Sequence, residues 1–136
     1  MLEIMLDTSV CVRALRDRSG LLRSHFRSSA DRLCLSTIAL MELFYGVSLS
    51  SRPDHHKAEV EDFVQRLVLL DFDDEAAAHA ADIKTCLKRA GTPIGAHDTL
   101  IAGHARSRGL LLLTGNLGEF QRVPGLRCQD WTESLT

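Results

Sequence analysis

Four acidic residues have the clearest potential for chemistry in this sequence, although long stretches of chain separate them. They are Asp7, Glu42, Asp98 and Glu119. If folding brings these carboxylates together, they repel one another and raise one another's pKa unless a cation lies among them. Oxygen ligands without a histidine or cysteine set favour Mg²⁺ or Mn²⁺ over zinc. Because such an ion can activate water and neutralise charge on a phosphate, the predicted reaction is phosphodiester hydrolysis.

Asp7 directly follows a short apolar segment, residues 4–6, that is typical of a buried strand. An aspartate at this place is a good N-cap for the helix predicted to follow. Thr8 and Ser9 can cap that helix equally well, so we expect Asp7 to be available for another role.

Glu42 and Asp98 lie on two predicted helices. Glu42 is in the middle of the apolar run 38–45, which predicts a helix buried on most sides. A carboxylate there needs a metal, a cleft edge or an arginine. Asp98 is expected in the first turn of a helix over 96–107, where an acid also stabilises the helix dipole. The apolar later turns of that helix predict that it packs on the sheet and begins near the same crevice.

Residues that follow the leucine-rich strand predicted over 110–113 complete the set of candidates. Asn116 is either a turn former or a site residue, and Glu119 is either a solvated acid of a short helix or a fourth acid of the site. The residues predicted to support the acids or the substrate are Thr8, Ser9, Thr114 and Asn116.

Short apolar strands separated by helices must position these side chains. Such strands predict an α/β fold, here a three-layer α/β/α domain with a short central parallel sheet over residues 1–136. Ligands of these sheets bind beyond the carboxyl ends of the strands, where the acids are expected. The predicted strands are 4–6, 33–35, 68–70, 110–113 and a last one near 127–128. The predicted helices are 10–15, 20–27, 36–49, 55–66, 73–91 and 96–107.

Composition excludes several classes of protein. No apolar run approaches the roughly 20 residues of a membrane span, and the first residues lack a basic signal-peptide region, so we expect a cytosolic protein. The four cysteines form no Cys-x-x-Cys pair, which predicts small buried or half-buried thiols and no zinc ribbon. The net charge of −2 neither suggests nor excludes RNA, since six arginines gather between residues 13 and 32.

Four segments of this sequence resemble the PIN-domain VapC toxins of bacterial toxin–antitoxin pairs. The segments are MLDTSV at 5–10, STIALMELFYGV at 36–47, GTPIGAHDTLIAGHARSRGL at 91–110 and TGNLGEFQRVPGLRCQDW at 114–131. The resemblance implies an endoribonuclease dependent on Mg²⁺ or Mn²⁺, with tRNA among the plausible RNA substrates. It also implies a homodimer, a neutralising VapB-like antitoxin, and an acidic quartet at Asp7, Glu42, Asp98 and Glu119.

Two residues depart from the pattern of this family. Ser9 stands where many members have asparagine, and Gly115 stands where Thr-Asn-Asn is common, which predicts a looser loop before Glu119. Two alternatives stay open. A HAD-like phosphatase also has an aspartate after its first strand, but it needs a second acid where Ser9 stands. A non-catalytic binding protein with a PIN-like fold is the other.

Overall fold

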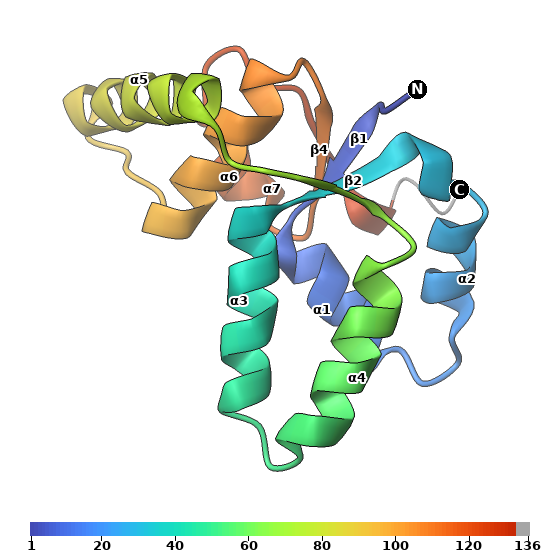
Figure 1. The fold of residues 1–136 in the computed structure, drawn as a ribbon. Coiled ribbons are helices and arrows are strands. Elements are labelled where there is room, and N and C mark those ends of the chain that lie inside the picture. The colour runs from blue at the N-terminus through green and yellow to red at the C-terminus, as the bar shows by residue number, and fades with distance from the viewer. Residues whose placement is uncertain (133–136) are drawn as a thin grey trace.

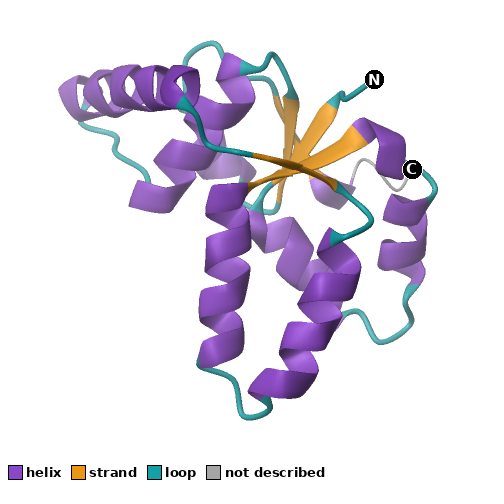
Figure 2. Cartoon of the chain, in the orientation of Figure 1, coloured by secondary structure: helices purple, strands orange, loops and turns teal. Residues whose placement is uncertain are grey.

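The computed structural model describes residues 1–132 of the chain. Its centre is a five-stranded, entirely parallel sheet with the strand order β3-β2-β1-β4-β5 (Figure 2). The strands are β1 (Ile4–Leu6), β2 (Leu33–Ser36), β3 (Val68–Leu70), β4 (Leu111–Thr114) and β5 (Cys128–Asp130). The sheet confirms the predicted α/β architecture.

Helices cover the sheet and project beyond it. α5 packs along α6, whereas α3 and α4 extend as a pair away from the strands (Figure 1). No helix within residues 1–132 is both long and apolar enough to cross a membrane. The helices are α1 (Thr8–Arg16), α2 (Leu21–Arg27), α3 (Thr37–Ser48), α4 (Pro53–Val64), α5 (Asp74–Ala90), α6 (Ala96–Ser107) and α7 (Leu117–Phe120), with a 3₁₀ turn at Ala30–Arg32.

The observed boundaries differ from the predicted ones by a few residues. α4 begins at Pro53 and not at residue 55, because proline suits the first helical position, where no backbone N–H is needed. β4 and β5 each run further along the chain than expected, so that Thr114 is the last residue of its strand.

The register of the sheet brings the chain segments after β1 and β4 together. Ile4 pairs with Leu111 and Leu6 pairs with Leu113. The backbone N–H of Asp7 then donates to the Leu113 carbonyl at 3.0 Å. Since both strands point the same way, Asp7 and the end of β4 lie side by side at the carboxyl edge of the sheet.

Close packing of α6 on α5 depends on one glycine. A Cβ atom at Gly103 would lie 2.6 Å from the backbone nitrogen of Ala80, which is too close for any side chain. This approach fixes α6, and with it the place of Asp98 in its first turn.

α3 corrects one expectation drawn from the sequence. Only Ala39 and Leu43 of this helix are fully buried, while Met41, Phe44 and Tyr45 are exposed. The helix therefore packs through one stripe and is not buried on most sides. Its second face is apolar and open, a combination that periodicity could not distinguish from burial.

The cysteines also differ in part from expectation. All four are free thiols. Cys11 and Cys34 are buried and Cys128 is half-buried, as predicted, but Cys86 is exposed on α5. α5 presents much of its surface to solvent because it lies at the outside of the molecule.

Candidate active site

Asp7 is the most constrained acid of the site. Its side chain is almost fully buried, with the residue 1% exposed. Oδ1 accepts hydrogen bonds from the Val10 backbone N–H at 3.0 Å and from Ser9 Oγ at 2.6 Å. Oδ2 accepts one from Thr114 Oγ1. Burial raises the pKa of Asp7, and its hydrogen bonds act in the opposite direction.

The capping of α1 corrects another expectation. Asp7 is itself the N-cap, through its bond from Val10, and neither Thr8 nor Ser9 takes that role. Ser9 holds the Asp7 carboxylate instead, and Thr8 holds Glu42. The predicted choice between cap and site residue was false, because a carboxylate has enough acceptor positions for both.

Glu42 lies at the edge of the site on the second turn of α3. Its Oε1 accepts a hydrogen bond from Thr8 Oγ1 at 2.6 Å, and its Oε2 lies 3.4 Å from His97 Nδ1. The side chain is 26% exposed. Of the three partners considered for this acid, the cleft edge is the one observed, and no arginine pairs with Glu42 within residues 1–132.

Asp98 and Glu119 lie together at the starts of two other helices. The pKa of Asp98 is raised to about 7, first because the carboxyl is buried and then because it shares a hydrogen bond with Glu119. The negative charges of Glu119, Asp7 and Glu42 raise it further. Gly95 leaves room for this carboxylate, since a Cβ atom there would lie 3.3 Å from Asp98 Oδ2.

The structure therefore brings together all four acids singled out in the sequence. They come from the starts of α1, α6 and α7 and from the second turn of α3. The negative charges of the other three all act on Asp98. This is a concentration of negative charge at the carboxyl edge of a parallel sheet, where ligands of such folds bind.

Thr114 and Asn116 support the site in different ways. Thr114 is fully buried and donates its hydroxyl hydrogen bond to Asp7. Its oxygen accepts one from the backbone N–H of Asn116 at 2.8 Å. The Asn116 side chain is exposed and makes no cap for α7, so its contact with Thr114 is made by the backbone.

The two departures from the family pattern touch each other. The Gly115 backbone N–H donates to Ser9 Oγ at 3.0 Å. A Cβ atom at Gly115 would lie 3.2 Å from the same oxygen, closer than side chains normally approach. The small residue at 115 and the serine at 9 therefore form one unit, and the expected loosening of the loop is offset by this bond.

Histidines near the site occupy two different environments. His97 is exposed, as predicted for a helix-terminal histidine, yet it lies against Glu42. His104 is fully buried on the same helix, and its Nδ1 lies 2.8 Å from Ser36 Oγ. No sequence pattern predicts the contact of His104 with Ser36, because a histidine on an apolar helix face does not indicate which residue it will meet.

The donor set of the acids suits a hard divalent cation. A carboxylate oxygen accepts about two hydrogen bonds. Oδ1 of Asp7 receives two, whereas Oδ2 of Asp7 and both oxygens of Glu42 have one neighbour each. Lone pairs thus remain on both acids, and a cation would relieve the repulsion that raises the pKa of Asp98.

The acids are nevertheless more widely spaced than a compact ligand cage. In the described part of the chain, one group of three potential metal ligands has its ligand atoms all within 4.8 Å of one another. It consists of His55, His56 and Glu59 on α4. The acidic quartet contains no set this tight among those residues. Magnesium usually keeps several water ligands and few carboxylates, so the wider spacing is compatible with it.

Comparison with known proteins identifies the family. The sequence matches the PIN domain family over residues 4–126. It is 47% identical over 131 residues to a tRNA(fMet)-specific endonuclease VapC from Salmonella typhimurium, covering 96% of this chain and 99% of that protein. This chain belongs to the VapC group of PIN-domain proteins. A ribonuclease VapC2 from Haemophilus influenzae is 42% identical over 131 residues, which cover 96% of this chain and 99% of the relative.

Solved structures of this group have the same fold. A crystal structure of DNA-bound VapBC from Salmonella typhimurium matches this PIN-domain chain with a TM-score of 0.91 at 46% identity, covering 96% and 99% of the two chains. VapBC-1 from nontypeable Haemophilus influenzae matches with a TM-score of 0.83 at 30% identity, covering 96% and 99%. The predicted resemblance is confirmed, and these comparisons support neither a phosphatase nor a non-catalytic protein.

Proposed function

We propose that this chain is the toxin of a type II toxin–antitoxin pair and a metal-dependent endoribonuclease. It hydrolyses phosphodiester bonds of RNA and thereby inhibits translation and growth until an antitoxin neutralises it. The observation that carries this proposal is the convergence of Asp7, Glu42, Asp98 and Glu119 in a chain of the VapC group.

In this proposal Asp7, Glu42 and Asp98 would hold the metal, and Glu119 would support it directly or through water. The ion is Mg²⁺, with Mn²⁺ as a substitute. Bound there, the ion supplies an activated water and neutralises charge on the phosphate. Asp7 offers Oδ2, because Oδ1 already accepts two hydrogen bonds. Ser9 and Thr114 fix the orientation of Asp7, and Thr8 fixes that of Glu42.

Asp98 and Glu119 share a proton in this proposal when no cation is present. Their hydrogen bond requires one carboxyl group to be protonated, and the pKa of Asp98 near 7 allows this at neutral pH. The Asp98 and Glu119 carboxylates would hold a bound cation in place of that proton. His97 lies at the rim beside Glu42, where it can reach a substrate phosphate.

The substrate in this proposal is a structured RNA such as tRNA, so the enzyme acts in the cytosol. Two relatives at 47% and 44% identity, from Salmonella typhimurium and Shigella flexneri, carry the name tRNA(fMet)-specific endonuclease. We propose the same substrate for this chain on the basis of that likeness, and mapping the cut bond in tRNA tests it.

Protein partners account for the open apolar face of α3. Met41, Phe44, Tyr45 and Leu49 are exposed there, at 42%, 37%, 64% and 70%. Such a patch on a soluble domain usually marks a protein interface. We propose that a VapB-like antitoxin and a second copy of this chain cover this side of the molecule, and that an antitoxin arginine neutralises the acids.

The first test is cleavage of total cellular RNA by the purified protein with Mg²⁺, with Mn²⁺ and with EDTA. Asp98→Asn should abolish metal-dependent cleavage. Asp74→Asn is the matched control, because Asp74 occupies the first turn of α5 as Asp98 occupies the first turn of α6. Thermal unfolding of both variants checks that the fold is intact.

Discrete fragments that require both the metal and Asp98 would support the nuclease. Full activity of Asp98→Asn, or cleavage that persists in EDTA, would contradict the assignment of the acids. If the wild type cleaves no RNA after any bound antitoxin has been removed, the proposed reaction is wrong.

The partner proposal has its own test. Light scattering of the purified chain should give the mass of a dimer, and the antitoxin encoded next to it should form a complex that no longer cleaves RNA. Tyr45→Asp should weaken one or both assemblies. Unchanged assembly in that variant would show that another surface is used.

A further inference from the structure

An open groove of about 830 Å³ lies between α1 and α2, beside the acids. Thr8 and Ser9, whose hydroxyls hold Glu42 and Asp7, form the end of the groove that adjoins the site. Arg13, Arg16 and Asp17 of the α1 end and Trp131 of the C-terminal segment also line it.

Three residues of α1 form a stripe along this groove. Ser9, Arg13 and Arg16 are four and three positions apart, so their side chains lie on one face of the helix. Ser9 and Arg16 are about 10 Å apart along the helix axis, at 1.5 Å per residue. The stripe therefore leads from the carboxylate cluster to the far end of α1.

Of the six arginines between residues 13 and 32, three pair with acids, while Arg13, Arg16 and Arg18 do not. Arg13 and Arg16 are exposed and form no ion pair with any residue from 1 to 132. A protein with a net charge of −2 thus keeps two cations unneutralised beside its most acidic site. The arginines that do pair with acids are Arg23, Arg27, Arg32, Arg66 and Arg106.

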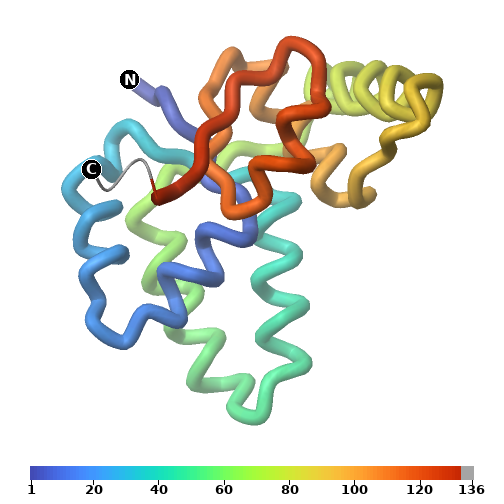
Figure 3. Tube along the Cα trace, turned by 180° about the vertical axis from the view of Figure 1, so that it is seen from behind, coloured from blue at the N-terminus to red at the C-terminus, as the bar shows by residue number. Residues whose placement is uncertain are grey.

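An aromatic ring forms part of the same groove. Trp131 is half-buried, and the Arg13 guanidinium lies 5.3 Å from the centre of its ring. The ring is also close to the site, since its Cδ1 would lie 3.6 Å from a Cβ atom at Gly115. Figure 3 shows the C-terminal segment, in red, descending beside α1, in dark blue. Trp131 is the only tryptophan of the chain.

Local stability explains only part of this arrangement. Arg13 and Arg16 lie in the last turn of α1, where cations favour the helix dipole. That role requires neither a shared groove nor an aromatic ring from the other end of the chain. Asp17 also lines the groove, but its carboxylate is occupied by the Ser19 hydroxyl and the Leu22 N–H.

We infer that this groove binds a single-stranded segment of the RNA next to the cleaved bond. Arg13 and Arg16 contact backbone phosphates, and Trp131 stacks on a base. Positive side chains combined with an aromatic platform are the usual means of holding a single strand without reading its sequence. The inference rests on the proposed function and adds the path of the strand, which that function leaves open.

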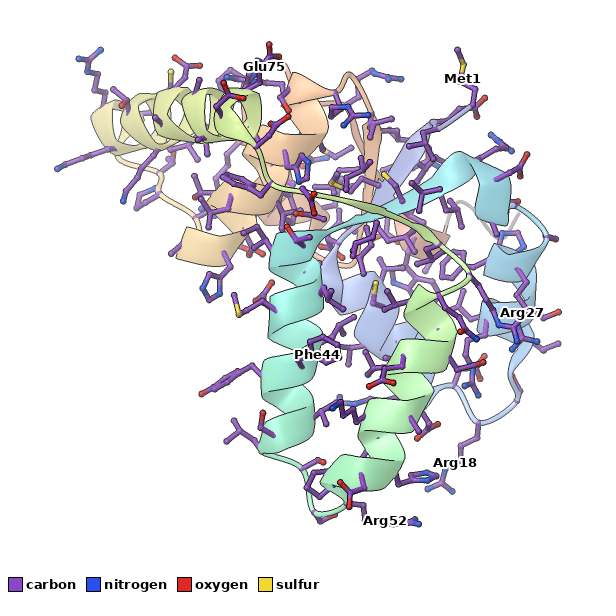
Figure 4. All side chains as sticks on the ribbon, viewed as in Figure 1. Met1, Arg18, Arg27, Phe44, Arg52 and Glu75 are labelled. Atoms are coloured by element: carbon purple, nitrogen blue, oxygen red, sulfur yellow. The ribbon has the colours of Figure 1, made fainter. Side chains whose placement is uncertain are left out.

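Binding is measured with the full chain carrying Asp98→Asn, so that RNA is not cut, by anisotropy of a fluorescent single-stranded oligoribonucleotide at several salt concentrations. Arg13→Gln with Arg16→Gln should weaken binding about tenfold. The slope of log affinity against log salt should fall in magnitude by about 1.4, from 0.7 for each of two phosphate contacts. Arg52→Gln with Arg89→Gln removes the same charge elsewhere and should change neither quantity. Arg52 lies at the α3–α4 turn (Figure 4).

Trp131 gives an independent readout. Its fluorescence should be quenched when the oligonucleotide binds, because no other tryptophan contributes. Trp131→Ala should weaken binding about tenfold, since stacking of one base on an aromatic ring is worth that much or more. The salt slope should not change, because no charge is lost. Trp131→Phe should restore most of the affinity.

The outcomes separate this inference from the proposed function. If wild-type cleavage occurs but the arginine and tryptophan variants bind RNA like their controls, the groove is wrong and the nuclease stands. If the variants lose only antitoxin binding, the groove is a protein interface and the inference is overturned. Loss of affinity with an unchanged salt slope in the double arginine variant would contradict phosphate contact.

Discussion

Two helices of this protein begin directly after buried strands, and each begins with a buried polar cap. α1 follows β1 and is capped by Asp7, while α3 follows β2 and is capped by Ser36, whose Oγ accepts from the Ile38 N–H. Both residues are at most 1% exposed. The local pattern of apolar strand, polar cap and helix is therefore the same in both places.

What surrounds each cap differs. Asp7 interacts electrostatically with Glu42 and Asp98, and burial raises its pKa. Ser36 is neutral and faces His104, which packs edge-on against Phe72. A neutral, hydrogen-bonded cap costs little to bury, whereas a carboxylate in a cluster of carboxylates is costly unless a cation joins it. The comparison therefore predicts a role in catalysis for the Asp7 cap and a role in stability for the Ser36 cap.

The largest expected effect is on catalysis at the first cap. Asp7→Asn should lower metal-dependent RNA cleavage at least about 100-fold, because a ligand that stabilises charge in the reaction is lost. The fold should survive, since asparagine caps helices as well as aspartate does. Asp73→Asn is the control, because Asp73 caps α5 away from the site. Equal cleavage by the two variants would contradict a catalytic role for Asp7.

At the second cap the expected effect is on stability. Ser36→Ala should lower the free energy of unfolding by about 2 kcal/mol, because the Ile38 N–H and His104 both lose a partner in the core. Cleavage by the folded protein should stay within about threefold of wild type, since it is the Asp7 cap that joins the acids. Chemical denaturation measures the first quantity. Ser28→Ala, at an exposed hydroxyl, should change stability by less than about 0.5 kcal/mol.

A smaller effect on stability is expected at the contact between Gly115 and Ser9, beside Asp7. Gly115→Ala should destabilise the protein by about 1 kcal/mol, because its Cβ atom meets Ser9 Oγ at 3.2 Å. Ser9→Ala should remove part of that cost, with a coupling of about 0.5 kcal/mol or more in a double-mutant cycle. Strict additivity of the two changes would mean that the residues do not act as a unit.

The smallest expected effect is a pH dependence at the second cap. Burial lowers the pKa of His104; Arg108 lowers it further, while Asp73 and Asp71 raise it. Protonation therefore favours the unfolded chain, so the stability contributed by neutral His104 is complete above pH 6.5 and is lost as the pH falls below it. His104→Asn should show a shallower loss of stability between about pH 7 and pH 5. The exposed His25→Asn should keep the wild-type slope.

The sequence predicted more of the fold than of the contacts. The parallel sheet followed from short apolar strands separated by helices, since only strands covered on both faces are apolar throughout. Asp7, Asp98 and Glu119 could be chosen because each follows a strand or begins a helix, and Glu42 because it is a lone carboxylate in an apolar run. α3 was misjudged because periodicity reports which residues are apolar, and not which of them a neighbouring element covers.

The sequence alone shows which carboxylates exist, which elements carry them, and which family the chain resembles. Tertiary structure alone decided that Asp7 both caps α1 and joins the cluster, that Ser9 and Gly115 contact each other, and that Trp131 lies beside Arg13. The physical reason is that local signals act over a few residues. Hydrogen bonds and charge interactions depend instead on distances between segments that the chain brings together only on folding.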